Sequence, residues 1–494
     1  MNKFDNLPLA FFKNRPNYPW YVVGTVFIGA FMAALDTSII TVALPTIARD
    51  FHDSISVTAW VALAYLLTLT ALLAIFGRIA DIVGRRPLYT IGFTVFIIGS
   101  AICGAAPNLP ILILARILQA IGAVLLQSNS IAIVTSAVPE HSRGKAIGIQ
   151  GTALAVGLSL GPTIGGFLIG TFGWRSIFYV NVPVGIIGTT LAALILPRDN
   201  LKKAEVRRPF DFIGAFLIAV SLVFLLYGIN QGNERGWSSP VIIISIILGI
   251  IMLFGFYLQE KRHKAPIIDF ALFKITNLTW GNLSGAITYA VMYGVLFIIP
   301  YYLEEVLKFP SAHSGLLTSP LPLGMMILAP IAGRIADRLG EKIPTVMGAI
   351  LMFVGTTGLI FLSPTSSIVI MILLLFIIGV GMGVFTPPNN SSVMGSTPPE
   401  SLGVSSGMLN MARSLGQSVG IALAFAIFQG VTIVLGFTMN TAPVHALVDS
   451  FHTTIIGLSI LSILVMLISI FRSSNSTDKR GPNHSKNLAE FTME

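Results

Sequence analysis

The chain has 494 residues, of which 54% are hydrophobic and only 10% are charged. Soluble domains carry about 25% charged residues, so this composition excludes an ordinary water-soluble protein and indicates a protein of the lipid bilayer. The net charge of +9 comes from basic residues between apolar runs, which indicates membrane topology and not a nucleic-acid partner. A single cysteine, Cys103, excludes a disulfide framework and a thiolate metal site.

Apolar runs of about 18 residues or more predict membrane-spanning helices. No cleavage site follows the basic N-terminus, so we expect the first helix to be retained. The fourteen predicted spans fall into groups of six, two and six: Tyr21–Leu44, Thr58–Phe76, Pro87–Ala106, Pro110–Val134, Ala146–Gly170 and Ser176–Leu196; Phe210–Ile229 and Pro240–Leu258; Trp280–Leu303, Gly315–Ile331, Pro344–Leu362, Ile368–Phe385, Met408–Ile433 and Thr453–Phe471.

These groups predict an all-α polytopic membrane protein with a simple domain order. We expect a cytoplasmic N-terminus (residues 1–20), an N-terminal six-helix bundle (21–196) and a linker with two additional helices (197–278). A C-terminal six-helix bundle (279–471) and a disordered cytoplasmic tail (472–494) follow. With the N-terminus inside, 24 of the 30 Lys and Arg lie in inner segments and 4 in outer loops. Both termini are therefore expected in the cytoplasm.

A ten-residue segment between the second and third predicted helices recurs 256 residues later. Six residues are identical, and both copies end in basic residues. The duplication and the two bundles resemble the major facilitator superfamily of secondary transporters, and the segment resembles that family's G-x-x-x-D-x-x-G-R-[RK] motif. The resemblance implies gating loops that hold the cytoplasmic side closed, with residues Gly77, Asp81, Gly84, Arg85 and Arg86 and, in the second copy, Gly333, Asp337 and Gly340. An ordinary basic loop is the alternative.

Asp36 is an ionisable residue inside the first predicted helix. Such a residue costs at least about 2.5 kcal/mol to insert, so it is a candidate for reversible proton binding. Arg116 lies at a similar depth in the fourth helix and can meet it. We therefore expect Asp36 and Arg116 to couple proton uptake to transport. A purely structural ion pair is the alternative.

The fourth predicted helix continues with polar residues. From Arg116 it resembles the family's R-x-x-Q-G segment, except that Ala120 and Ile121 stand between Gln119 and Gly122. Together with polar and aromatic residues of the second bundle, these side chains are candidates for a substrate cavity: Gln119, Gln127, Asn129, Tyr289, Tyr293, Phe297, Asn410 and Arg413. Aromatic faces suit apolar or cationic ligands, although core packing is the alternative for each aromatic residue. Glu304 and Glu305 are candidates for an outer vestibule, with solvated loop charge as the alternative.

The fifth predicted helix carries glycines every four residues, at Gly157, Gly161 and Gly165. This spacing permits close helix contact, and Pro162 is expected to bend the helix. With Gly166, the segment resembles the antiporter motif G-x-x-x-G-P-x-x-G-G, which implies a moving interface between the bundles. A tight-packing seam is the alternative. Periodicity places Ala155 on the lipid-facing side of this helix.

The strings LDTSIITVALP and WRSIFYVNVPVG resemble the fourteen-helix drug:proton antiporter branch. The resemblance implies a proton-driven exporter of amphipathic drugs or toxic organic compounds in a bacterial cytoplasmic membrane. A carrier of one metabolite, lipid or siderophore is the alternative. We expect no enzymatic activity, metal or cofactor, the proton-motive force being the energy source, and we expect a monomer. The resemblance leaves open a periplasmic adaptor as a partner.

Overall fold

The computed structural model describes residues 10–472 apart from 54, 59, 198–210, 264–265, 269, 310 and 438–441. All regular secondary structure in this described part is helical. Thirteen of its helices are long and apolar enough to cross a membrane, or fourteen when the bent helix α7 counts as one span. The chain is therefore an all-α, multi-pass membrane protein, which confirms the predicted fold class. The predicted N-terminal residues 1–9 and the tail beyond residue 472 lie outside the described residues.

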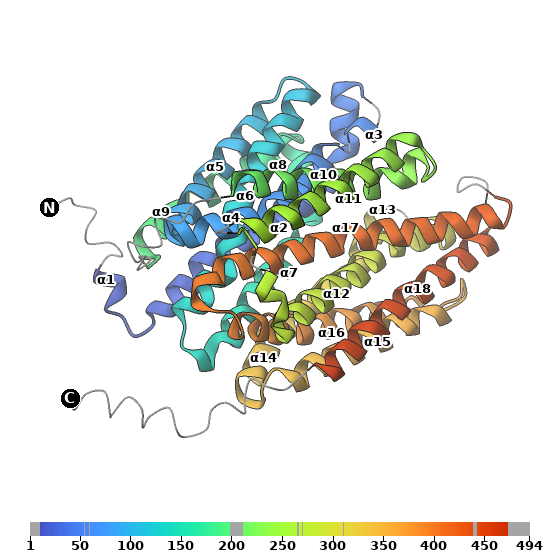
Figure 1. The fold of residues 1–494 in the computed structure, drawn as a ribbon. Coiled ribbons are helices and arrows are strands. Elements are labelled where there is room, and N and C mark those ends of the chain that lie inside the picture. The colour runs from blue at the N-terminus through green and yellow to red at the C-terminus, as the bar shows by residue number, and fades with distance from the viewer. Residues whose placement is uncertain are drawn as a thin grey trace, which may run out of the picture.

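The first group of spans contains six long helices and three short ones. The long helices are α2 (Tyr18–Phe51), α4 (Trp60–Val83), α5 (Arg85–Ala105), α6 (Leu109–Ala137), α7 (Arg143–Phe172) and α9 (Asn181–Ile195), and the short ones are α1 (Ala10–Lys13), α3 (Ile55–Thr58) and α8 (Ser176–Tyr179). In Figure 1 these helices, blue to cyan and blue-green, lie together on one side of the molecule.

Two helices follow, and then the second group. The pair is α10 (Phe212–Arg235) and α11 (Pro240–Arg262), and the second group is α12 (Thr276–Tyr301), α13 (Ser311–Thr318), α14 (Pro320–Leu339), α15 (Lys342–Gly358), α16 (Ile368–Gly395), α17 (Leu402–Val434) and α18 (Val444–Phe471). The yellow to red helices lie on the other side in Figure 1. Helix α10 contacts α11, α4 and α17, so the additional pair packs against one helix of each bundle.

Helix boundaries follow local chemistry. Asn108 caps α6 through a 3.0 Å hydrogen bond that its Oδ1 accepts from the Ile111 amide, and Asp211 caps α10 in the same way at Gly214. Such caps satisfy amides that have no partner inside the helix.

The duplicated segments expected as loops are mostly helical. Gly77 and Asp81 lie inside α4, and Asp337 lies inside α14. Only the turns at Gly84 (φ 108°) and Gly340 (φ 84°) interrupt the helices. This positive φ is accessible to glycine without the penalty that a Cβ would bring. We call the end of the molecule that carries these two turns the motif end.

Each bundle has its own apolar core. Tyr89, Phe93 and Phe96 of α5 are fully buried in the first bundle, and Phe385 and Phe451 are buried in the second. A third apolar cluster joins α4, α6, α10, α11, α16 and α17. The cavity described next lies between the bundles.

Candidate functional site

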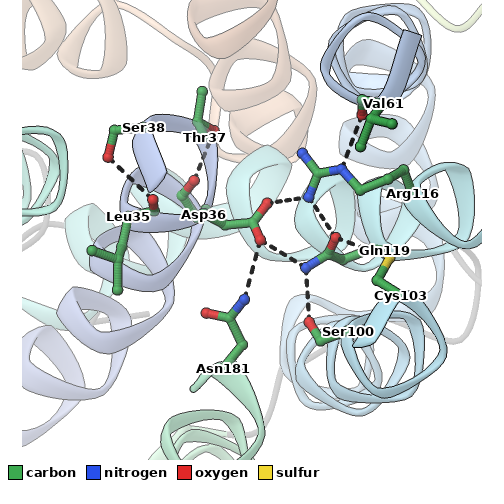
Figure 2. Close-up of polar contacts among 11 residues, drawn as sticks. Leu35, Asp36, Thr37, Ser38, Val61, Ser100, Cys103, Arg116, Gln119 and Asn181 are labelled. Carbon is green, nitrogen blue, oxygen red and sulfur yellow. Dashed lines mark hydrogen bonds and ion pairs between the residues drawn. The ribbon is translucent and has the colours of Figure 1, made fainter. Parts of the chain in front are cut away.

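Three donors from two helices surround the Asp36 carboxylate of α2. Arg116 Nη1 lies 2.6 Å from Oδ2, Gln119 Nε2 lies 2.8 Å from Oδ1, and Asn181 Nδ2 lies 3.1 Å from Oδ1. Figure 2 shows these side chains converging on Asp36. Asp36 and Arg116 are each only 1% exposed. Removing one partner of such a buried pair typically costs about 3–5 kcal/mol, because the other charge is left uncompensated.

Arg116 is held from several directions. Its Nε donates to the Val61 carbonyl at 3.1 Å, and its Nη1 also donates to Gln119 Oε1 at 2.6 Å. The guanidinium lies over the Tyr65 ring, 4.3 Å from its centroid. A cation over an aromatic face is stabilised by the ring quadrupole. The similar depths of Asp36 and Arg116 in the sequence therefore predicted this pair correctly, whereas nothing in the sequence marked Tyr65 as its neighbour.

Asn181 is a further residue that the sequence analysis left without a role. It opens α9 and is 1% exposed. A polar residue among the apolar residues of a predicted span was the signal that could have marked it, since buried polar groups need partners.

A cavity of about 670 Å³ lies between the two bundles. Five of the predicted cavity residues line it: Gln127, Tyr289, Tyr293, Phe297 and Arg413. Arg116 and Tyr65 also line it, so the Asp36 network borders the cavity. The lining continues to residues at the starts of α4 and α14, such as Ala62 and Pro322, so the cavity extends toward the end opposite the motif end.

The cavity has an apolar and cationic lining. Aliphatic and aromatic side chains provide most of its lining, and its polar groups include the amides of Gln127, Gln231 and Gln417 and the hydroxyls of several serines and threonines. Arg413 donates a hydrogen bond to Gln127 Oε1, across the two bundles. Two arginines and no Asp or Glu are among the lining residues. A cationic ligand would therefore meet no carboxylate at the cavity wall.

Three predicted cavity residues are not among the residues that line this cavity. Gln119 is fully buried, and its amide nitrogen bonds both Asp36 and Ser100, the latter at 2.7 Å. Asn129 is fully buried and donates back to the Leu125 carbonyl of its own helix. Asn410 lines a small pocket that adjoins the cavity and shares Leu154, Tyr289 and Arg413 with it.

The motif end is closed by carboxylates that reach across the bundles. Asp81 Oδ1 accepts from the Gly403 amide at 2.9 Å, and its Oδ2 accepts from the Val404 amide at 3.0 Å, at the start of α17. A carboxylate at a helix N-terminus is favoured by the free amides and by the helix dipole. Arg85 also lies 3.1 Å from Asp81.

The second copy of the motif makes the equivalent contact in the opposite direction. Asp337 accepts from the Gly144 amide at 2.8 Å and from the Lys145 amide at 2.9 Å, at the start of α7. A Cβ at Gly77 would lie 3.1 Å from the Gly403 carbonyl carbon, and one at Gly333 would overlap the backbone of Gly144.

Arg86 makes a contact within its own bundle. Its Nη2 donates to the Ala193 carbonyl of α9 at 2.6 Å. The two aspartates and the close glycine backbones supply cross-bundle contacts at the motif end.

The glycine seam packs inside the first bundle, so the expected interface between bundles at this seam is wrong. A Cβ at Gly157 would lie 2.7 Å from Ala34 Cβ, and Cβ atoms at Gly161 and Gly165 would meet Ser38 and Ile39. All these neighbours belong to α2. The three glycines approach a neighbouring helix as closely as expected, but that helix is α2, which carries Asp36.

Helix α7 contacts the second bundle through other residues. A Cβ at Gly148 would lie 2.5 Å from the Ala329 carbonyl oxygen of α14, and Thr152 Oγ1 donates to the Met326 carbonyl at 3.3 Å. Ala155 is fully buried in the core cluster of the second bundle, so its predicted lipid-facing position is wrong.

The outer part of α7 changes direction near Pro162. The segments Glu140–Gly161 and Thr163–Phe172 meet at 42°. Gly166 is exposed, and no atom lies within 4 Å of a Cβ built there. It therefore takes no part in the seam with α2.

Glu304 and Glu305 lie in a π-helical turn, Tyr302–Val306, at the end of α12. The Glu305 carboxylate lies 3.6 Å from Lys308 Nζ, and both side chains are more than half exposed. Neither glutamate lines the cavity. Among the residues that the structure describes, no group of three or more His, Cys, Asp or Glu is arranged to hold a metal ion.

Two bundles around a central cavity, with paired contacts that close one end, define a membrane transporter. Residues 26–421 match the Major Facilitator Superfamily, and the chain belongs to that family. It is 37% identical to the riboflavin transporter RibZ of Clostridioides difficile (strain 630), over 86% of this chain and 91% of that protein. It is 31% identical to the multidrug transporter protein MdtP of Bacillus subtilis (strain 168), over 82% of this chain and 74% of that one.

Solved structures support the same fold. The human organic anion transporter MFSD10 (TETRAN) aligns with a TM-score of 0.67 and 16% identity, covering 92% of this chain and 100% of that chain. The proton:xylose symporter XylE aligns with a TM-score of 0.65 and 16% identity, covering 92% and 96%.

Proposed function

We propose that the chain is a proton-coupled exporter of amphipathic aromatic compounds that carry no net positive charge. The observation that carries this proposal is the cavity of about 670 Å³, lined by aromatic and aliphatic side chains, with arginines and amides and no carboxylate among its lining residues. Binding sites for drug-sized ligands typically have volumes of about 300–1,000 Å³. The lining favours neutral or anionic aromatic ligands over dications.

Alternating access would use the two carboxylate contacts at the motif end. Asp81 and Asp337 each bind backbone amides of the opposite bundle, so both contacts must break for that end to open. The positive-inside rule places the motif end in the cytoplasm. On this assignment the described conformation faces outward from a bacterial cytoplasmic membrane, with both termini cytoplasmic.

Proton coupling would use Asp36 through Arg116. The Arg116 guanidinium bonds the Asp36 carboxylate and also borders the cavity. While Asp36 is charged it holds Arg116 at the cavity wall, where the guanidinium would meet a neutral or anionic ligand. A proton on Asp36 removes the charge that holds Arg116, so the guanidinium would leave this position and the ligand would be released. Proton binding and substrate binding would in this way exclude each other, as exchange requires.

The sequence resemblance to the fourteen-helix drug:proton antiporter branch supports export, as do relatives with multidrug names. Inward or outward transport of a single metabolite is the second candidate. The relative described as a riboflavin transporter favours it, because that protein is 37% identical and is covered over 91% of its length. Riboflavin is also an amphipathic aromatic compound without positive charge, so one cavity suits both candidates. A periplasmic adaptor stays an open partner, and we expect a monomer.

A growth and dye-efflux panel tests the proposal in cells that lack their own pumps. Expression of the chain should lower the accumulation of neutral and anionic aromatic dyes in the presence of a proton gradient, and Asp36→Asn should abolish that effect. Lower accumulation of dications alone would contradict the assigned cavity chemistry. Increased uptake of riboflavin with no efflux of any dye would instead support the second candidate.

A further inference from the structure

The additional helix α10 supplies one side chain to the wall of the substrate cavity. Of the described residues of α10 and α11, Gln231 alone lines that cavity. It lies four residues before the end of α10 at Arg235. Helix α10 contacts α4 of the first bundle and α17 of the second, and both of these helices line the cavity as well. The additional pair therefore takes part in the candidate binding site itself.

A neighbouring aromatic contact fixes where the Gln231 face of α10 lies. Residues four apart in a helix share a face, and Tyr227 comes four residues before Gln231. The Tyr227 ring lies 5.8 Å from the Trp60 ring, measured between centroids. Trp60 opens α4, whose next turn supplies Ala62 and Leu63 to the cavity. This face of α10 is therefore turned toward the part of α4 that borders the cavity.

The Gln231 amide has no partner within the described part of the chain. The residue is only 8% exposed, and its amide makes no hydrogen bond to another described residue. Neither amide atom is enclosed, in contrast to the unpartnered oxygens of Gln150 and Asn282, which a water-sized group cannot reach. Because the side chain lines the cavity, the amide is reached from there. Buried polar groups usually have partners, so a ligand or water must supply this one.

The other two amides of the cavity are engaged by neighbouring side chains. Gln127 Oε1 accepts a hydrogen bond from Arg413. Gln417 interacts with the Tyr293 hydroxyl. An arginine can only donate, whereas a carboxamide offers an N–H donor and a carbonyl acceptor side by side. Gln231 therefore offers the cavity a paired donor and acceptor that neither of the other two amides has free.

The complement of a free carboxamide is a lactam or imide edge, in which a ring N–H stands beside a ring carbonyl. Such an edge can donate to Gln231 Oε1 and accept from Gln231 Nε2 at the same time, in the paired geometry by which glutamine reads a base edge. A carboxylate or phosphate only accepts and an ammonium only donates, so either would leave one of the two amide atoms without a partner.

We propose that Gln231 is a specificity-determining residue that binds the lactam or imide edge of an aromatic substrate. This inference rests on the proposed function, because it assigns the ring of that substrate to the main cavity. The substrate class is therefore an uncharged aromatic compound with neighbouring N–H and C=O groups on its ring, as in a flavin or a pyrimidinedione.

Two flavins that differ at one atom of this edge test the inference on the purified full-length protein. Lumiflavin carries a hydrogen on N3, between two carbonyls, and 3-methyllumiflavin carries a methyl group there. Wild-type protein should bind lumiflavin about tenfold more tightly, because the methyl group removes the hydrogen bond to Oε1. Equal affinities would mean that only water meets the amide, and they would overturn the inference while leaving the proposed function standing. If neither flavin binds, the assigned substrate class is wrong, and the efflux panel decides the proposed function separately.

Matched variants localise the effect to Gln231. Gln231→Met replaces the amide by an apolar side chain of similar length, so it should weaken lumiflavin binding about tenfold and leave 3-methyllumiflavin binding unchanged. The control is Gln429→Met, because Gln429 is a half-buried glutamine of α17 that does not line the cavity. It should keep the wild-type preference for lumiflavin. An equal loss of this preference in Gln231→Met and Gln429→Met would contradict the assignment.

A second variant guards against loss of folding in the first. Gln231→Leu removes the same amide with a differently shaped apolar side chain, and the preference for lumiflavin should vanish in it as well. Wild-type affinity for 3-methyllumiflavin identifies a variant that is folded. A preference for lumiflavin that persists in either folded variant would show that another residue reads N3, and the assignment to Gln231 would be wrong.

Discussion

Replacing Gly161 by leucine should impair transport, because Gly161 packs directly against the helix that carries Asp36. A Cβ at Gly161 would overlap Ser38 Oγ and would lie 2.7 Å from Ser38 Cβ and 3.0 Å from the Ile39 amide nitrogen. Ser38 Oγ is hydrogen bonded to the Leu35 carbonyl at 3.1 Å and to the Gly157 carbonyl at 3.0 Å. It cannot turn away without losing these bonds, so α2 must move.

The magnitude follows from overpacking, which typically costs about 1–3 kcal/mol. Strain of about 1.4 kcal/mol on the present arrangement around Asp36 would lower the population of that arrangement tenfold. The displaced segment lies two residues from Asp36, so the bonds from Arg116 and Asn181 to its carboxylate would also be strained. We expect Gly161→Leu to reach the membrane and to lose most of its transport.

The assay is substrate efflux driven by an imposed pH gradient in proteoliposomes, with protein insertion measured separately. Gly166→Leu is the control in the same helix, since no atom lies within 4 Å of a Cβ at that position. It should transport at close to the wild-type rate. Normal transport by Gly161→Leu would refute the reasoning, because α2 and α7 would then tolerate separation at this contact.

Three further predictions concern charged groups. Asp36→Asn keeps the shape of the side chain but cannot take up a proton, so flavin or dye binding should persist and become independent of pH. A pH dependence equal to that of wild-type protein would mean that Asp36 does not couple protons to transport. Asp81→Ala removes both hydrogen bonds to the start of α17. Cysteines placed on the motif-end side of the cavity should therefore react faster with a water-soluble maleimide. Unchanged rates would mean that these bonds do not hold that end closed. Asp50 accepts hydrogen bonds from the Trp174 indole and from Arg175, which lower the pKa of its carboxyl. Wild-type protein should therefore melt at a higher temperature than Asp50→Asn at neutral pH, and this difference should disappear as the pH falls through the lowered pKa. A difference that persists in acid would contradict an ionic contribution.

The helices were predictable because each must satisfy its backbone inside the bilayer and therefore appears as a long apolar run. The approach of Arg116 to Asp36 was predictable as well, since both residues count to a similar depth and a buried charge needs a partner. The extent of the two turns at the motif end was harder to predict. Gly84 and Gly340 adopt the positive φ expected of turns, but the residues on either side, which were expected in loops, are helical.

The direction in which a side chain faces was not predictable. Lipid and protein interior are equally apolar, so a small residue such as Ala155 gives no signal that separates the two. The partner of the Gly161 seam was missed for the same reason, because glycine spacing indicates close contact but does not identify the neighbouring helix. Gln119 was assigned to the cavity on polarity alone, whereas its amide is fully used by Asp36, Ser100 and Arg116.

Coupled movement of protons and substrate in proteoliposomes tests the central claim most directly. Purified protein would be reconstituted with a pH indicator inside the vesicles, and riboflavin and an anionic aromatic dye would be offered in turn under an imposed pH gradient. The account predicts uphill movement of at least one of them with protons moving the opposite way, and loss of both movements in Asp36→Asn. Substrate movement that only equilibrates, at the same rate with and without the gradient and in both proteins, would contradict it.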